Sequence, residues 1–256
     1  MKNTIRNELA VCGRAAVQAL AERHPERIAR LYIHRDRARE FGELCSRMAA
    51  DKKPYNVVAE ADLEKLSDTV HHQGVVAMIE PPRIEPVDAR LVEAWARAGE
   101  KVVALDGIGN ALNLGAVVRS MAFFGIRTLV VSDDDKDAKP TTSAYRVAQG
   151  GMELVRIHRT QTAAAFARIA EGKLIRVGAD HRGKIGAGVL SAQLGAGQGV
   201  ALFLGNEEEG LSPAVRQLMD KLVSIPGSGE VESLNVAQAA TVFCWELAGR
   251  KSDGNR

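Results

Sequence analysis

The sequence predicts an α/β protein with a C-terminal parallel-sheet domain and a small N-terminal α/β domain. Short apolar runs alternate with segments of helical periodicity along the 256 residues, a pattern typical of a mostly parallel sheet covered on both faces. Three prolines between Ile79 and Val87 interrupt this pattern, because proline can neither continue a helix nor pair in a central strand. We therefore predict a small first domain at 5–80, a linker at 81–87, the larger domain at 88–250 and a frayed tail at 251–256.

In the N-terminal part, strand and helix patterns follow one another in order. Helices are predicted at about 13–23, 38–50 and 61–67, because apolar residues recur there at helical spacing. Strands are predicted at 28–33, 55–59 and 74–80, which are short and rich in Val and Ile. This alternation predicts a small α/β sandwich.

After the linker the alternation continues. Strands are predicted at 101–108, 128–133, 153–157, 174–180, 200–207 and 221–226, and helices at 112–124, 162–171, 212–219 and 234–248. Ligands of such sheets bind beyond the carboxyl ends of the strands. The loops that follow Leu105, Leu204 and Ile225 are therefore the candidate functional loops.

Composition narrows the class of protein only slightly. The net charge is +2, and no apolar run approaches the roughly 20 residues of a membrane span. The N-terminal residues lack the apolar core of a signal peptide, so we expect a cytoplasmic protein. Cys12, Cys45 and Cys244 lie far apart and outside any CxxC pattern, which predicts reduced, buried thiols and no metal site.

The segment 22–40 is rich in arginine, including Arg23, Arg27, Arg35 and Arg37. Several of these side chains could face one way and contact phosphates. The alternative is a solvated face, since four acids are interspersed with them. The segment alone leaves both interpretations open.

The first candidate loop, 105–125, carries glycines at 107, 109 and 115. Their spacing does not fit the dinucleotide-binding fingerprint, in which two residues separate the second and third glycines. We expect Asn113 to cap the following helix. Arg119 stands among apolar neighbours of that helix, so we expect it to reach the surface close to the ligand edge of the sheet.

The other two loops are polar at strand ends. In FLGNEEEGLS, 203–212, three consecutive acids lie between two glycines, which allows close backbone approach and suits a cationic ligand better than a phosphate-rich one. In IPGSGEVESLNV, 225–236, either Ser233 or Asn235 can cap the last helix and leave the other for a ligand. We interpret Glu230 and Glu232 as plain surface acids.

Together, NLGAVVRS (113–120), LGNEEEGLS (204–212) and IPGSGEVESLNV (225–236) resemble the three motifs of the SpoU (TrmH-like) branch of the SPOUT methyltransferases. The N-terminal part is similar to the ribosomal-protein-like RNA-binding module often fused to these enzymes. The chain departs from the family pattern at Gly227, where Met is common, and at Ala237-Gln238, where Ser-Val is common. YRVAQGGMEL (145–154) also replaces a Ser-Ala-Gly-rich segment.

The resemblance implies a deep trefoil knot in the C-terminal domain and S-adenosylmethionine as cofactor. It implies a homodimer that packs through the first and last helices of this domain, with Trp245 contributing. The residues implied to bind the cofactor are Leu204, Gly205, Asn206, Ile225, Gly229, Leu234 and Asn235.

The implied reaction is methyl transfer to a ribose 2′-hydroxyl of structured RNA, with ribosomal RNA favoured. The implied catalytic residues are Arg119, Asn113, Glu207, Ser233 and Asn235, and the implied RNA contacts are Arg23, Arg27, Arg35, Arg37 and Arg119. A free guanidinium has a pKa above about 12, so we expect Arg119 to anchor a phosphate and stabilise the developing alkoxide rather than to act as a base.

Three alternatives stay open at this point: a transfer RNA methyltransferase, a non-catalytic RNA-binding or ribosome-assembly factor with the same fold, and a nucleotide-dependent enzyme on an ordinary open sheet. The intact Asn113, Arg119, Glu207 and Asn235 argue against the second. The wrong glycine spacing and the missing Walker lysine motif argue against the third.

Overall fold

The computed structural model describes residues 8–133, 138–195 and 197–248, and the tail predicted at 251–256 lies outside these ranges. The chain forms two compact units. The first takes its described residues from Met1–Arg83 and Pro140–Leu154, and the second takes them from Ile84–Lys139 and Val155–Arg256. Each unit is described by itself below.

The first unit is built on a four-stranded sheet of order β1-β4-β2-β3. β2 and β3 are parallel, and β4 runs antiparallel to both β1 and β2. The three predicted strands are confirmed, whereas β1 was not predicted. The elements are β1 (Leu9–Cys12), α1 (Arg14–Arg23), η1 (Pro25–Arg27), β2 (Ile28–His34), η2 (Arg35–Arg37), α2 (Gly42–Ala50), β3 (Tyr55–Val58), α3 (Glu60–Ser67) and β4 (Val75–Ile79).

A later segment of the chain, Pro140–Leu154, completes this unit with α6 (Thr142–Ala148) and η3 (Gly151–Glu153). The Arg27 guanidinium donates to the buried Glu153 carboxylate at 2.8 Å and to the Tyr145 hydroxyl at 3.1 Å. Burial raises the pKa of Glu153 above its ordinary value, against the opposing charge of Arg27. The strand predicted at 153–157 is therefore wrong in its start, because Glu153 ends a 3₁₀ turn and β8 begins only at Arg156.

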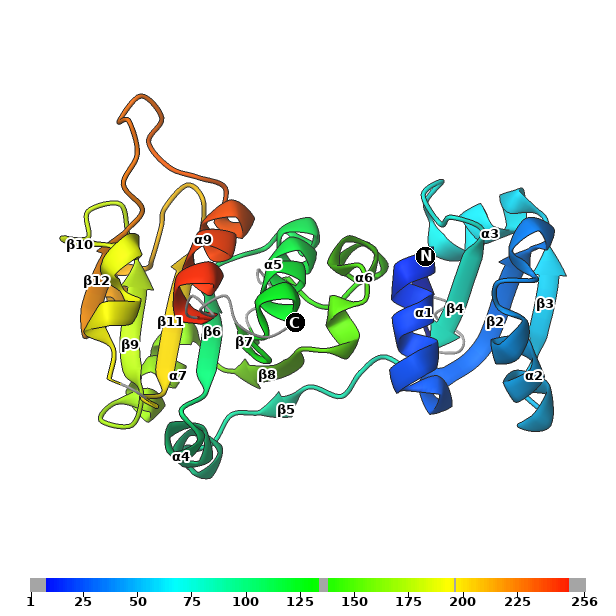
Figure 1. Cartoon of the computed structure of the whole chain (residues 1–256), viewed down its shortest axis with the longest axis horizontal. Coiled ribbons are helices and arrows are strands. Elements are labelled where there is room, and N and C mark those ends of the chain that lie inside the picture. Colours follow the sequence, from blue (N-terminus) through cyan, green and yellow to red (C-terminus); the bar gives the residue numbers. More distant parts are fainter. Residues whose placement is uncertain (1–7, 134–137, 196, 249–256) are drawn as a thin grey trace, which may run out of the picture. The chain divides into compact units, whose positions relative to one another are not determined.

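The second unit is built on an eight-stranded sheet of order β10-β12-β9-β11-β6-β7-β8-β5, and every strand pairing in it is parallel (Figure 1). The predicted parallel-sheet α/β class is thus confirmed. Pro86 lies in the edge strand β5, where a missing ladder donor is tolerated. The strands are β5 (Glu85–Pro86), β6 (Lys101–Asp106), β7 (Thr128–Ser132), β8 (Arg156–Thr160), β9 (Ile175–Ala179), β10 (Ile185–Gly186), β11 (Val200–Gly205) and β12 (Lys221–Ser224).

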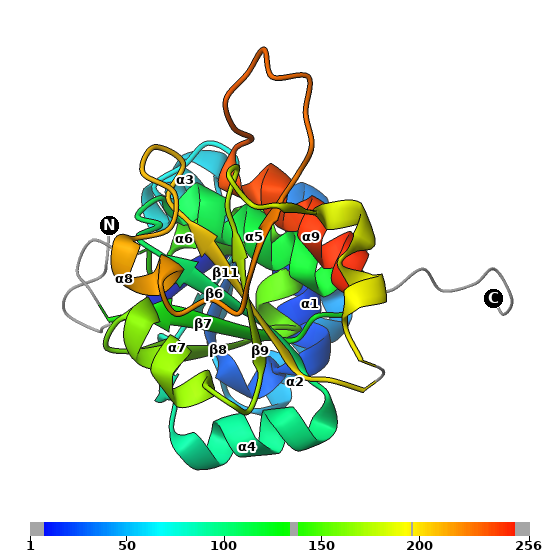
Figure 2. The same cartoon turned by 90° about the vertical axis from the view of Figure 1, so that its left-hand side faces the viewer.

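Helices cover both faces of this sheet (Figure 2). Val102 and Ala104 of β6 share one core cluster with α4, α7 and α8, in which the Phe166 and Phe203 rings lie 5.6 Å apart. Side chains alternate along a strand, so Val103 and Leu105 point to the other face, where α5 and α9 pack on each other. The remaining elements are α4 (Ala89–Ala98), α5 (Ala111–Phe124), α7 (Ala163–Ala170), η4 (Ala187–Val189), η5 (Ser191–Gln193), α8 (Pro213–Arg216) and α9 (Val236–Ala248).

The thiols of Cys12 and Cys244 are buried, as predicted, and Cys45 is half-buried. Burial raises the pKa of Cys12 to about 11 and that of Cys244 to about 12. These two thiols therefore stay protonated and behave as small apolar side chains. Within the described part of the chain, no helix has the length and apolar character needed to cross a membrane.

Candidate active site

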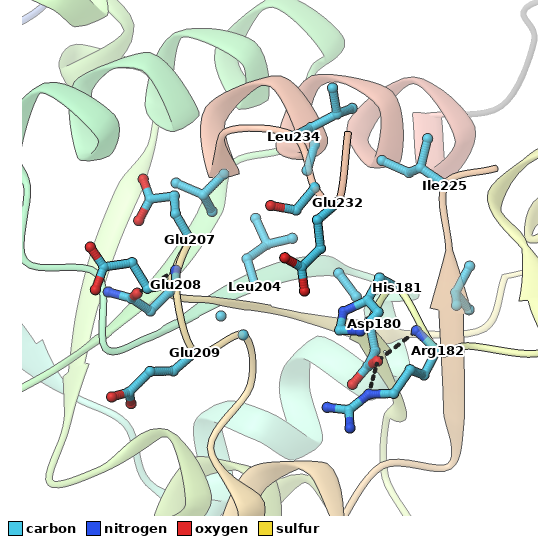
Figure 3. Close-up of a pocket in the computed structure, with 18 of the residues that line it drawn as sticks. Asp180, His181, Arg182, Leu204, Glu207, Glu208, Glu209, Ile225, Glu232 and Leu234 are labelled. Atoms are coloured by element: carbon cyan, nitrogen blue, oxygen red, sulfur yellow. Dashed lines mark hydrogen bonds and ion pairs between the residues drawn. The ribbon is translucent and has the colours of Figure 1, made fainter. Parts of the chain in front are cut away.

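A cavity of about 260 Å³ lies at the carboxyl edge of the second unit's sheet (Figure 3). The strand order places β12, β9 and β11 side by side, so the loops that follow these three strands meet there. Part of the cavity lining is apolar and includes Leu204, Ile225 and Phe243. The predicted loops after Leu204 and Ile225 do come together.

The loop after β11 folds back on itself through two glycines. Asn206 and Gly210 exchange two backbone hydrogen bonds of 3.1 and 2.9 Å. A Cβ atom on Gly205 would stand only 2.2 Å from the carbonyl carbon of Gly210, so this position admits glycine alone. The Asn206 side chain donates to the carbonyl of Gly107 at 2.9 Å and thereby ties this loop to the one after β6.

Three motif side chains from distant parts of the sequence form one hydrogen-bonded cluster beside the cavity. Asn113 of α5 donates to the Glu207 carboxylate. The Asn235 amide donates to Asn113 at 3.2 Å and to Glu207 at 3.4 Å. We call these three residues the Asn-Glu-Asn cluster. It connects the first helix motif, the acidic loop and the start of α9.

Helix capping determines which of these polar side chains remain free to contact a ligand. Asn235 caps α9, with its side-chain oxygen accepting from the backbone N–H of Ala237 at 2.9 Å, and Ser233 lines the cavity. The prediction that Asn113 caps α5 is wrong. Asn110 is the cap, accepting from Leu112 N–H at 2.8 Å, because the helix begins two residues before Asn113 and places that side chain in its first turn.

Most of the predicted cofactor residues line the cavity, namely Leu204, Gly205, Asn206, Ile225 and Leu234. Gly229, with φ of +87°, is not among the lining residues. Asn235 adjoins the lining through Leu234 and takes part in the Asn-Glu-Asn cluster instead. Glu232, which we interpreted as a plain surface acid, does line the cavity and lies across it from Glu209 in the close-up (Figure 3).

Sequence reasoning missed the loop that follows β9. The side chains of Asp180, His181 and Arg182 form the wall opposite the acidic loop (Figure 3). Asp180 is buried, and its carboxylate accepts from the Arg182 N–H at 2.8 Å and from the Arg216 guanidinium. A signal was available, because the strand predicted at 174–180 ends with Asp180 and is followed directly by the polar residues His181 and Arg182.

The charge of the cavity wall is predominantly negative. Five lining side chains are carboxylates and two are arginines, and both arginines pair with Asp180. Glu207, Glu208, Glu209 and Glu232 therefore set the potential of the opening. Such a wall favours a cationic ligand with an apolar part.

Arg119 is exposed on α5, as predicted, and within the described residues its guanidinium has no hydrogen-bonding or ion-pairing partner. It does not line the cavity. The other four predicted RNA contacts do not share one face. Arg27 precedes the seven-residue strand β2 and binds Glu153, whereas Arg35 and Arg37 follow that strand, about 20 Å further on. Arg23 is exposed at the end of α1.

Comparison with known proteins identifies the class to which this fold and site belong. The model of the SpoU rRNA methylase family matches residues 100–245. A second model, described as RNA 2′-O ribose methyltransferase substrate binding, matches residues 10–85.

Relatives agree with these matches. The 23S rRNA (guanosine-2′-O-)-methyltransferase RlmB of Escherichia coli K12 is 32% identical over 251 residues, covering 94% of this chain and 98% of the relative. An uncharacterized tRNA/rRNA methyltransferase, YfiF of Escherichia coli O157:H7, is 34% identical, covering 93% of this chain and 67% of its own length. The chain spans 44% of a further relative from Haemophilus influenzae.

The chain therefore belongs to the SpoU family of RNA methyltransferases. Solved structures share its fold. The SpoU methyltransferase AviRb of Streptomyces viridochromogenes, in complex with AdoMet, has a TM-score of 0.73 at 24% identity and covers 98% of this chain and 93% of its own. An AdoMet-bound rRNA methyltransferase of Sinorhizobium meliloti has a TM-score of 0.76 at 21% identity, with coverages of 95% and 88%.

Proposed function

We propose that this protein transfers a methyl group from S-adenosylmethionine to a ribose 2′-hydroxyl of structured RNA, with ribosomal RNA as the first candidate substrate. The observation that carries the proposal is the Asn-Glu-Asn cluster beside a cavity lined by carboxylates and apolar side chains. Family membership supports the reaction class. The relative RlmB, which matches along nearly its whole length, is named for the same chemistry on 23S rRNA.

The residues of the cavity fit S-adenosylmethionine, which supplies an electrophilic methyl group when bound. Leu204, Ile225 and Leu234 offer apolar contact for an adenine ring, and the glycine pair 205 and 210 leaves backbone groups close to the cavity. The surrounding carboxylates favour a sulfonium and an ammonium group over phosphates. Gly229 contributes by the sharp turn that its positive φ allows in the 225–235 loop.

The chain's own side chains have separate roles in the proposed reaction. Arg119, exposed and without a partner in the described residues, anchors an RNA phosphate and stabilises negative charge that develops on the ribose oxygen. Glu207 is held by Asn113 and Asn235 and fixes the rim on which the ribose rests. Ser233, at the cavity wall, hydrogen-bonds the cofactor or the ribose. Alignment of the two reacting groups supplies a large part of the rate.

A homodimer and a trefoil knot are parts of this proposal. An exposed aromatic group on α5 and α9 supports the dimer: the Phe124 and Trp245 rings lie 5.9 Å apart, and Phe123 beside them is 81% exposed. For the knot, the supporting observation is that β12 lies between β9 and β10, which precede it in the chain. Because the proposed substrate is RNA, a cytoplasmic location is also part of the proposal.

The experiment pairs calorimetry with S-adenosylmethionine and a tritium-methyl assay on separated ribosomal and transfer RNA. Arg119→Ala should bind the cofactor as the wild type does and lose about 100-fold or more in methyl transfer, the scale of a lost charge-stabilising donor. Arg168→Ala, which removes an exposed arginine of α7, is the control and should leave both unchanged. A folded wild-type protein without cofactor heat would refute the proposal, and methylation of transfer RNA alone would change the substrate.

A further inference from the structure

The first unit has a cavity of its own, of about 360 Å³, at one edge of its four-stranded sheet. The parallel strands β2 and β3 end there with His34 and Val58, and β4 begins there at Val75. This edge is therefore the carboxyl end of two parallel strands, the position at which α/β sheets place ligands. The lining residues come from the turn after β2, the start of α3 and the 70–74 loop.

The 70–74 loop is held in an unusual backbone conformation. Gln73 and Gly74 are consecutive residues with positive φ, +55° and +80°, and a non-glycine residue in this region indicates a constrained site. The buried His72 holds this loop in place, because its Nδ1 accepts a hydrogen bond from the Gly74 N–H at 3.0 Å. A Cβ on Gly74 would stand 2.9 Å from Cγ of Arg37, so the glycine makes room for the arginine stem.

The side chains around this cavity suit one unpaired nucleotide better than a row of phosphates. Arg37 is the only full positive charge among the lining residues, and Asp36 and Glu60 oppose it. A pure phosphate site would not carry that excess of carboxylates. His34, His71 and Arg37 instead offer planar groups on which a base can stack, which is how proteins hold unpaired RNA bases.

Hydrogen-bonding groups for a base edge are also present. The Gln73 side-chain oxygen accepts from Arg14 N–H at 2.9 Å, and no partner for its amide nitrogen is found in the described residues, which leaves that group as a donor. Carboxylates such as Glu60 accept from the amino groups of bases. Val70, 66% exposed, adds an apolar contact at the rim.

We propose that this cavity, lined by His34, Arg37, Glu60, His71 and Gln73, binds a single unpaired base of the RNA substrate. The proposal rests on the proposed function, because it assumes that the protein acts on RNA. It assigns recognition of an unpaired segment to the 70–74 loop and the turn after β2. It does not include Arg27 among the RNA contacts, because the Arg27 guanidinium is bound to Glu153 and Tyr145.

Fluorescence anisotropy on the full chain, with a short labelled single-stranded RNA of mixed sequence and the same sequence in a duplex, tests this. Arg37→Ala and His71→Ala should each weaken single-strand binding at least about fivefold, which corresponds to about 1 kcal/mol, the lower end for a lost stacked base. Arg47→Ala is the charge-matched control. Its side chain is 44% exposed on α2 and is not among the cavity residues, so binding should change less than about twofold.

The outcomes separate this inference from the proposed function. If Arg37→Ala and Arg47→Ala weaken binding equally, or if the duplex loses as much as the single strand, the surface is a general phosphate contact and the inference is wrong. His71→Ala keeps the test valid if Arg37→Ala fails to fold. If the wild type methylates RNA and His71→Ala binds RNA as tightly as the wild type does, only the proposed base-binding role of the cavity is refuted. If the wild type neither binds nor methylates RNA, the proposed function is refuted.

Discussion

Gly205→Ala tests whether the close approach of the two glycines in the acidic loop builds the cofactor cavity. The added Cβ would stand 2.2 Å from the carbonyl carbon of Gly210, 2.3 Å from its oxygen and 2.3 Å from the nitrogen of Leu211. All three are backbone atoms, so no side-chain rotation relieves the overlap. The loop must move away, and this breaks the paired hydrogen bonds between Asn206 and Gly210.

The magnitude follows from these contacts. Overpacking in a well-packed region costs about 1–3 kcal/mol, and each lost hydrogen bond adds about 1 kcal/mol where water does not replace it. With two bonds lost, we expect a loss of about 3–5 kcal/mol in the free energy of unfolding of the second unit. At about 2–4 °C per kcal/mol for a domain of this size, the melting temperature should fall by roughly 6–20 °C.

The assay combines thermal unfolding with calorimetric titration of S-adenosylmethionine. We expect cofactor affinity to fall more than about tenfold, because the displaced loop carries Asn206, Glu207 and Glu208 of the cavity wall. Gly227→Ala is the matched control, since a Cβ there meets nothing within 4 Å and its φ is not positive. If Gly205→Ala melts and binds like Gly227→Ala, the argument from the glycine contact is wrong.

Three further outcomes follow from the same structure. Asn235→Ala removes the cap of α9 and one member of the Asn-Glu-Asn cluster, so it should lower the free energy of unfolding in urea by about 1 kcal/mol and weaken cofactor binding. Unchanged cofactor affinity would show that the cluster does not support the cofactor cavity. Asp180→Ala should cost more, about 2–3 kcal/mol, because it removes the charged acceptor of the half-buried Arg216 guanidinium and of the Arg182 backbone N–H. A loss within 0.5 kcal/mol would contradict that pairing. Hydrogen bonds from Arg176 hold the pKa of Asp220 below its ordinary value of 3.8, so the ionised carboxylate stabilises the fold above that value and this stabilisation is lost as the pH falls through the lower folded-state pKa. Asp220→Asn should therefore lower the free energy of unfolding in urea by its full amount at pH 7 and by less below about pH 4. A loss that does not change with pH would contradict the ion pair between Asp220 and Arg176.

Local pattern was enough to predict the fold class and two sides of the cavity. Periodicity distinguishes buried parallel strands from amphipathic helices within a window of a few residues, so the strands β11 and β12, which end at Gly205 and Ser224, could be found from sequence. Glycines and acids at those strand ends then identified the loops. The exposure of Arg119 likewise follows from its long polar side chain, which reaches water from an apolar helix.

Other features depended on which strands lie next to one another, and a single sequence does not encode that locally. Asp180 reaches the cavity because β9 lies between β12 and β11, an order that no window of residues reveals. The same holds for Glu153, whose partner Arg27 is 126 residues away, and for the cluster that joins Asn113 to Asn235 across 122 residues. The sequence by itself determined the helices and strands and the polar residues at the strand ends. Only the tertiary structure decided which strand ends share a site, because strand pairing and ion pairs depend on contacts between segments that are distant in the chain.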